Sequence, residues 1–147
     1  MKKNSYIIKT HSPEETVEFA HKFSALLKPN DVITLYGDLA AGKTTFTKGV
    51  CKYFNADQDA TSPTFTLINE YHADLPIFHF DCYRIKHPDE IIMLGFDEYL
   101  EKEGVVLIEW PEKIGTHIPE DSIELHLEYI DDKKRRIEIR SPRLMEL

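Results

Sequence analysis

The sequence predicts a single α/β domain in which a mixed parallel and antiparallel sheet is flanked by helices and ends in a C-terminal β-hairpin. Two compact apolar runs, at Val32–Tyr36 and 105–110, are typical of strands that are buried on both faces. Apolar and polar residues alternate instead over 123–129 and 137–139, which predicts a hairpin with one buried face. The whole chain, 1–147, is long enough for one hydrophobic core and too short for two ordinary domains.

The N-terminal third alternates between strand and helix patterns. A short first strand is expected at 5–9. Ser12 is suited to cap a helix, because proline and glutamate follow it at the first and third helical positions, and an apolar face extends that helix to about Leu27. The strand Val32–Tyr36 then leads directly into a glycine-containing turn, and a second helix is expected at 43–54.

The middle of the chain predicts an antiparallel pair of strands followed by helical segments. The strands are expected at 64–71 and 77–83, joined by a short polar turn. A helical stretch begins at about His87, is interrupted by Gly95 and continues to about Lys102.

Composition excludes some classes of protein. The net charge of -8 argues against broad, non-specific binding to nucleic acid, which needs a basic surface. No apolar run approaches the roughly 20 residues of a membrane span, and the N-terminus does not read as a secretory signal, so we expect a cytoplasmic protein without membrane contact. Cys51 and Cys82 have no metal-type spacing and are expected as reduced, buried thiols rather than as a disulfide.

The turn after Val32–Tyr36 matches the phosphate-binding pattern G-x-x-x-x-G-K-[ST] at every required position. It consists of Gly37, Asp38, Leu39, Ala40, Ala41, Gly42, Lys43 and Thr44. The glycines allow backbone N–H groups to converge on a phosphate at a helix N-terminus. Lys43 brings a mobile positive charge to the terminal phosphates, and the Thr44 hydroxyl is a magnesium ligand in this pattern. Because the match lies between a strand and a helix, it predicts a P-loop NTPase domain.

A carboxylate at the end of a neighbouring strand is needed to complete a magnesium site. The apolar run at 105–110 contains such a residue, Glu109. A buried strand seldom ends in a carboxylate without a partner, because burying an unpaired charge is costly. Glu109 is therefore the predicted metal-binding acid.

A second carboxylate, Asp81, lies on the strand expected at 77–83. Alternation places Phe78, Phe80 and Cys82 on one face of that strand and His79 and Asp81 on the other. Asp81 is either an acid that orients the attacking water or part of a solvated strand face, and the residues alone leave both open. His79 and Asp81 lack the further ligands that a transition metal would need.

The class of P-loop protein follows from missing motifs. Neither N-K-x-D nor D-x-x-G, which guanine-nucleotide hydrolases carry, occurs in the chain. The arginine-rich lid of a small-metabolite kinase is also missing, since the segment from Phe54 to Arg84 has no arginine in between. An ATPase is favoured; a P-loop kinase of small metabolites and a nucleotide-gated binding module without turnover are the alternatives.

Four segments together resemble the TsaE family over nearly the whole chain and in the same order. They are Gly-Asp-Leu-Ala-Ala-Gly-Lys-Thr-Thr at 37–45, Ser-Pro-Thr-Phe-Thr-Leu-Ile-Asn-Glu-Tyr at 62–71, His-Phe-Asp-Cys-Tyr-Arg at 79–84 and Leu-Ile-Glu-Trp-Pro-Glu-Lys at 107–113. The resemblance implies a slow, magnesium-dependent ATPase that acts with TsaD and TsaB to form threonylcarbamoyladenosine next to the tRNA anticodon. It implies contact with tRNA only within that complex.

The resemblance also implies roles for individual residues. Lys43 is expected to act in catalysis and on phosphate, with Thr45 among the nucleotide-binding residues. Thr44 and Glu109 are the expected magnesium ligands, and Asp81 the catalytic or water-positioning acid. Further residues belong to the family segments: Thr64, in a switch-like loop at 62–64, is expected near the terminal phosphate, while Trp110 and Lys113 are either site residues or a packing aromatic and a solvated lysine.

Two features fit the resemblance less well. Ala40 replaces the glycine that is usual in the family, and it would cost on the order of 1 kcal/mol if the position requires a positive φ. The basic run at 133–136 lies in the predicted hairpin turn, where it is either solvated or in contact with tRNA, a partner subunit or the nucleotide.

Overall fold

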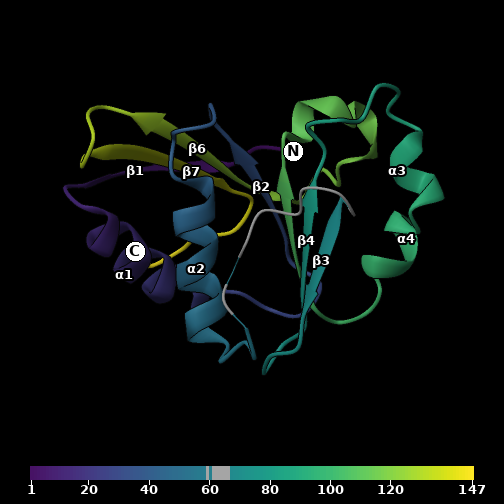
Figure 1. Cartoon of the computed structure of the whole chain (residues 1–147), viewed down its shortest axis with the longest axis horizontal. Coiled ribbons are helices and arrows are strands. Elements are labelled where there is room, and N and C mark those ends of the chain that lie inside the picture. Colours follow the sequence, from purple (N-terminus) through teal and green to yellow (C-terminus); the bar gives the residue numbers. More distant parts are fainter. Residues whose placement is uncertain (59, 61–66) are drawn as a thin grey trace.

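A mixed sheet forms the centre of the fold. In this computed structural model, which describes residues 1–58, 60 and 67–147, the described residues form seven strands in the order β1-β7-β6-β2-β5-β4-β3 (Figure 1). The strands are β1 (Asn4–Thr10), β2 (Val32–Tyr36), β3 (Ile68–Tyr71), β4 (Ile77–Asp81), β5 (Val105–Glu109), β6 (Ile123–Tyr129) and β7 (Arg135–Ser141).

The four central strands of the sheet run parallel. β2 pairs in parallel with both β5 and β6, and β4 pairs in parallel with β5. The outer strands are antiparallel: β3 lies against β4, β7 against β6 and β1 against β7. The predicted mixed α/β sheet with a C-terminal hairpin is therefore confirmed. Because parallel strands share one carboxyl edge, the loop after β2 and the ends of β4, β5 and β6 lie at the same edge of the sheet.

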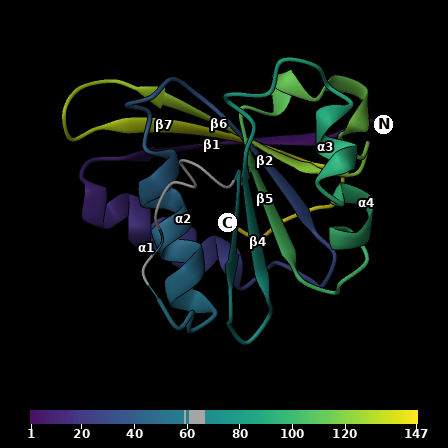
Figure 2. The same ribbon diagram turned by 45° about the vertical axis from the view of Figure 1, so that its right-hand side comes forward.

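Helices cover both faces of the sheet (Figures 1 and 2). The helices α1 (Pro13–Ser24) and α2 (Lys43–Tyr53) pack against each other on one face, and the short helices α3 (Glu90–Met93) and α4 (Phe96–Tyr99) cover the other. The 3₁₀ turns η1 (Pro111–Lys113) and η2 (Gly115–His117) follow β5. No helix among the described residues is long and apolar enough to cross a membrane.

Alternation along the strands separates two apolar cores. On the side of α1 and α2, side chains such as Phe23 and Phe46 pack with Leu35 and Leu107. On the other side, Phe80 packs edge-on against Phe96, with ring centroids 5.4 Å apart. The expected division of β4 into an aromatic face and a face with His79 and Asp81 is confirmed, since Phe78, Phe80 and Cys82 all belong to the second core.

The expected helices and strands are found, but several of them are shorter than the sequence predicts. The Ser12 hydroxyl accepts the Glu15 N–H at 3.1 Å and caps α1, but α1 ends at Ser24, where i→i−3 turn bonds replace the helical ladder. The stretch expected from 87 to 102 is two short helices, separated by Gly95 at φ 81°. The strand expected at 64–71 is found at Ile68–Tyr71, and 64–66 lie outside the described residues.

The hairpin of β6 and β7 has the expected buried face, with one exception. Its apolar side chains from Ile123 to Leu127 and at Ile137 and Ile139 are buried, but Tyr129 is 46% exposed. The prediction that Tyr129 belongs to the buried face is wrong, because the strand pair extends past the edge of the core there.

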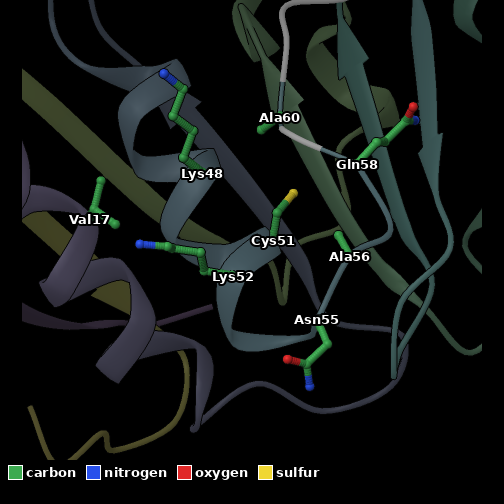
Figure 3. A pocket seen from close by; sticks show the side chains of 8 residues that line it. All are labelled: Val17, Lys48, Cys51, Lys52, Asn55, Ala56, Gln58 and Ala60. Atoms are coloured by element: carbon green, nitrogen blue, oxygen red, sulfur yellow. The ribbon is translucent and has the colours of Figure 1, made fainter.

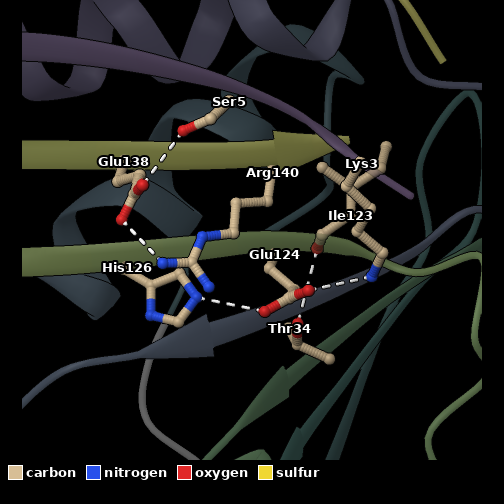
Figure 4. Close-up of polar contacts among 8 residues, drawn as sticks. All are labelled: Lys3, Ser5, Thr34, Ile123, Glu124, His126, Glu138 and Arg140. Atoms are coloured by element: carbon tan, nitrogen blue, oxygen red, sulfur yellow. Dashed lines mark hydrogen bonds and ion pairs between the residues drawn. The ribbon is translucent and has the colours of Figure 1, made fainter. Parts of the chain in front are cut away.

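The opposite face of the hairpin is held by polar contacts (Figure 4). Glu124 pairs with Lys3 at 2.9 Å and with His126 at 3.1 Å. Burial opposes ionisation of Glu124, but the hydrogen bonds from Lys3 and His126 outweigh it and lower the pKa of this carboxyl. The contact joins the N-terminal segment to β6. Cys51 and Cys82 are both buried and are not joined by a disulfide, as expected.

Candidate functional site

The phosphate loop lies between β2 and α2 and depends on two glycines. Gly37 has φ 149° and Gly42 has φ 100°. A Cβ on Gly37 would lie 2.6 Å from the Leu127 carbonyl oxygen, so the loop packs directly against the end of β6. A side chain at Gly37 would be strained by both its φ and this contact, which explains why the pattern requires glycine there.

Ala40 fits the loop without strain. The described non-glycine residues with positive φ do not include Ala40, which is exposed. The cost considered for alanine at this position therefore does not arise, because its backbone is in a region that any residue adopts.

Lys43 is buried at the start of α2 and is held by two contacts. Its side-chain nitrogen donates to the Gly37 carbonyl oxygen at 2.7 Å and lies 4.0 Å from the centroid of the Trp110 ring. Burial lowers the pKa of Lys43, while the charges of Glu109 and Asp81 act in the opposite direction. The structure thus places the cation between the phosphate loop and the two predicted acids.

Glu109 lies at the end of β5, only 4% exposed, with a buried histidine as its partner. His79 Nε2 lies 2.6 Å from a Glu109 carboxylate oxygen, and His79 is fully buried. With an ionised Glu109 as acceptor, the Nε2–H group of His79 is the donor of this hydrogen bond. The buried Nδ1 has no hydrogen-bond partner among the described residues. The sequence placed His79 beside Asp81 but did not reveal its bond to Glu109, which is 30 positions away.

Asp81 is paired in the sheet with Glu109, so the two predicted acids are neighbours. Asp81 is half-buried, and one carboxylate oxygen accepts the Tyr83 N–H at 3.0 Å. Burial and the charge of Glu109 raise the pKa of Asp81 against the opposing effects of the Tyr83 N–H, His79 and Lys43. The face that carries His79 and Asp81 is not a fully solvated one, because His79 is buried and Asp81 half-buried, and the role of Asp81 stays a prediction.

Trp110 has a strained backbone directly after Glu109. Its φ of 56° and ψ of 49° are left-handed, which costs a bulky residue roughly 1–2 kcal/mol. The turn brings the indole ring over Lys43 and to 5.0 Å from the Tyr83 ring. Trp110 therefore covers one side of the Lys43 ammonium, whereas Lys113 is exposed, as expected for a solvated lysine.

The donor set fits magnesium better than a transition metal. The described residues contain no group of three or more His, Cys, Asp or Glu side chains that could hold a metal ion. Magnesium is usually held by one or two protein oxygens together with substrate phosphates and water. The hydroxyl of Thr44, in the first turn of α2, and the Glu109 carboxylate at the end of the adjacent strand supply such oxygens.

A cavity of about 260 Å³ adjoins the phosphate loop. It is lined by Leu39, Ala40, Gly42, Lys43, Thr44, Thr45 and Arg135. Most of the residues predicted to bind nucleotide thus border one space, and Arg135 from the hairpin joins them. Thr64 lies outside the described residues. A second cavity of about 340 Å³, bordered by Lys48, Cys51 and Lys52, lies along α2 away from the phosphate loop (Figure 3).

A family model described as threonylcarbamoyl adenosine biosynthesis protein TsaE matches residues 10–137. The chain belongs to the TsaE family. Proteins of this family are named for the biosynthesis of threonylcarbamoyladenosine in tRNA, and the resemblance seen in the four sequence segments is confirmed.

Relatives match over most of their length. The TsaE protein of Bacillus subtilis is 43% identical over 130 residues, which cover 88% of this chain and 81% of the relative. That of Rickettsia bellii is 44% identical over 127 residues, 85% of this chain and 88% of the relative. A crystal structure of Bacillus subtilis YdiB superposes with a TM-score of 0.79 at 37% identity and covers 96% of this chain and 88% of that one. The P-loop fold expected from the sequence is thereby confirmed.

Proposed function

We propose that this protein is a slow, magnesium-dependent ATPase that supports formation of the threonylcarbamoyl group on adenosine next to the tRNA anticodon. One observation carries the proposal: the phosphate loop and two carboxylates, Asp81 and Glu109, meet at one edge of the sheet around the buried Lys43. A loop that only binds phosphate has no need for two acids beside its lysine, since negative charges there oppose binding of an anion.

The phosphate loop and α2 bind the nucleotide in this proposal. Backbone N–H groups of 37–45 hold the phosphates, and Lys43 exchanges its contact with the Gly37 carbonyl for one with the terminal phosphates. Thr44 and Glu109 would hold Mg²⁺, whose charge stabilises the negative charge that develops on the phosphate oxygens.

Asp81 acts on the attacking water. Its carboxylate orients the water and accepts a proton as the water oxygen bonds to the γ-phosphorus and the bond to the β-phosphate oxygen breaks, which gives ADP and phosphate. The raised pKa of Asp81 suits this role, because a more basic carboxylate is a better proton acceptor. Thr64 is proposed to lie near the terminal phosphate.

The pathway is proposed from the relatives. The Bacillus subtilis and Rickettsia proteins are named for tRNA threonylcarbamoyladenosine biosynthesis. We propose that this chain acts in the cytoplasm with TsaD and TsaB, and that ATP hydrolysis resets the complex rather than transferring the carbamoyl group. The net charge of -8 supports contact with tRNA only within the complex.

The test is release of phosphate from γ-labelled ATP, with and without purified TsaD and TsaB. We expect slow release that the partners stimulate and that Lys43→Ala abolishes. Label transferred to a small acceptor would instead indicate a metabolite kinase. ATP that is retained without turnover, with no change on Asp81→Ala, would indicate a nucleotide-gated binding module. Phosphate release that neither partner changes would support the ATPase activity but contradict the proposed pathway.

A further inference from the structure

The strand β1 forms one edge of the sheet. Among the described strands it pairs with β7 alone, and its register with β7 is unbroken from Asn4 to Thr10. An edge strand presents a row of backbone N–H and C=O groups that can pair with a further strand. Ile7, at the middle of β1, is 53% exposed. The edge is therefore a regular template for another strand, with an apolar side chain at its centre.

A groove of about 210 Å³ lies between β1 and α1, which covers this end of the sheet (Figures 1 and 2). The groove is lined by Ile8, Lys9 and Thr10 of β1 and by Glu15, Glu18, Phe19 and Lys22 of α1. Another side of α1 packs against α2, where Gly49 lies against the Val17 carbonyl. On that side the His21 ring also lies 5.1 Å from the ring of Tyr53. The groove-lining residues of α1 are thus on its flank away from α2, next to the open edge of β1.

The charges on this flank of α1 are divided along the helix. Glu15 and Glu18 lie toward its N-terminal end and Lys22 toward its C-terminal end, with the half-buried Phe19 between them. Within the described part of the chain, Glu18 and Lys22 form no ion pair, and Glu15 pairs only with the exposed His11, at 3.4 Å. Two such helices, packed side by side and antiparallel, would place the acidic end of each opposite the lysine of the other. The flank is therefore complementary to itself.

One two-fold axis, perpendicular to the sheet, can relate both β1 and α1 to a second copy. At the usual rise of a strand, Ile7 lies about 10 Å from the end of β1. The midpoint of the 12-residue α1, next to Phe19, lies about 9 Å from the start of that helix. Because only a short turn joins β1 to α1, the two midpoints lie at about the same height. An axis through Ile7 therefore also brings Glu15 of one copy opposite Lys22 of the other.

We propose that the β1 edge and this flank of α1 form an interface with a second copy of the chain. The two β1 strands pair antiparallel into one continuous sheet, and the two α1 helices pack beside each other on one face of it. Ser5 of one copy then lies opposite Lys9 of the other, so that no like charges meet across the two strands. Since β7 and β6 separate β1 from β2 in the sheet, the contact does not involve the phosphate loop.

Sedimentation velocity over a range of protein concentrations, with charge-reversed variants, tests this interface. We expect the wild type to form a concentration-dependent dimer. Glu15→Lys and Lys22→Glu should each weaken it by roughly tenfold or more, because each variant places like charges opposite one another on both sides of the axis. An equimolar mixture of these two variants should dimerise as the wild type does, since every pair across the axis is then of opposite charge. Glu14→Lys changes the charge equally but does not line the groove, and it should also behave as the wild type does.

Several outcomes would overturn the interface. A wild type that stays monomeric at every concentration would leave the edge open to another protein instead. A dimer that either reversal leaves intact would place the contact elsewhere, because a two-fold axis involves both residues equally. A mixture that fails to recover would do the same, and an equal loss in Glu14→Lys would indicate a general effect of charge. Thermal melting of each variant separates a loss of folding from a loss of contact.

Discussion

The two flanks of the phosphate loop use charge in opposite ways. On the β5 side, Asp81 and Glu109 lie in register, and their negative charges act on the buried Lys43, which also lies against Trp110. His79 binds Glu109 there. On the β6 side, the loop meets a backbone carbonyl and the stem of Arg135, and none of the described residues that line the cavity is a carboxylate. The proposed hydrolysis needs this difference, because acids beside a phosphate are useful only where a metal and a water are to be positioned.

The largest effect is expected on the acid flank from Asp81→Asn. Loss of a residue that accepts a proton should lower ATP turnover by roughly 10²–10⁴-fold, while ATP affinity stays close to that of the wild type. Turnover by the wild type should fall as the pH drops through the raised pKa of Asp81, at a higher pH than an ordinary aspartate would give. A pH profile of phosphate release checks both points. Wild-type turnover in the variant would contradict the role of Asp81.

A smaller effect is expected from His79, which positions Glu109 without touching the ligand. His79→Leu leaves the Glu109 carboxylate without its 2.6 Å hydrogen bond. We expect the Mg²⁺ concentration for half-maximal turnover to rise about 10–100-fold, as is usual when the partner of a metal ligand is lost. His79→Gln keeps a donor and should recover part of the loss. A variant that melts at a lower temperature with an unchanged Mg²⁺ dependence would make His79 a packing residue only.

The smallest effect is expected for the reactivity of the two thiols, which lie in the apolar cores on opposite sides of the sheet. Burial and the charges of Asp81 and Glu109 raise the pKa of the Cys82 thiol to about 12, so almost no thiolate is present at neutral pH. Cys51 instead borders the 340 Å³ cavity along α2, into which its sulfur points (Figure 3). In the folded protein, alkylation of Cys51 in Cys82→Ser should be faster than alkylation of Cys82 in Cys51→Ser. Equal rates in folded and unfolded protein would show that neither thiol is protected.

Features that depend on contiguous residues were predictable from the sequence. The phosphate loop is one run between a strand and a helix, and Glu109 is recognisable because a carboxylate ends an apolar strand. The face of β4 that carries Asp81 followed from simple alternation.

Features that depend on contacts between distant segments were not predictable. The bond between His79 and Glu109 requires the pairing of β4 with β5, and Arg135 reaches Gly42 only because β6 lies next to β2. The run at 133–136 looks uniform in the sequence, and only the pleat of β7 separates Arg135 from Arg136. The left-handed backbone of Trp110 has no sequence signal at all, since tryptophan rarely adopts it.

A crystal structure with Mg²⁺ and a non-hydrolysable ATP analogue tests the proposed roles of Glu109 and Asp81 beside the phosphate loop most directly. We expect the metal next to Thr44 and on the side of Glu109, with Asp81 facing the γ-phosphate. A metal remote from Glu109, or an Asp81 side chain that faces away from the γ-phosphate, would contradict the proposed roles of the two acids.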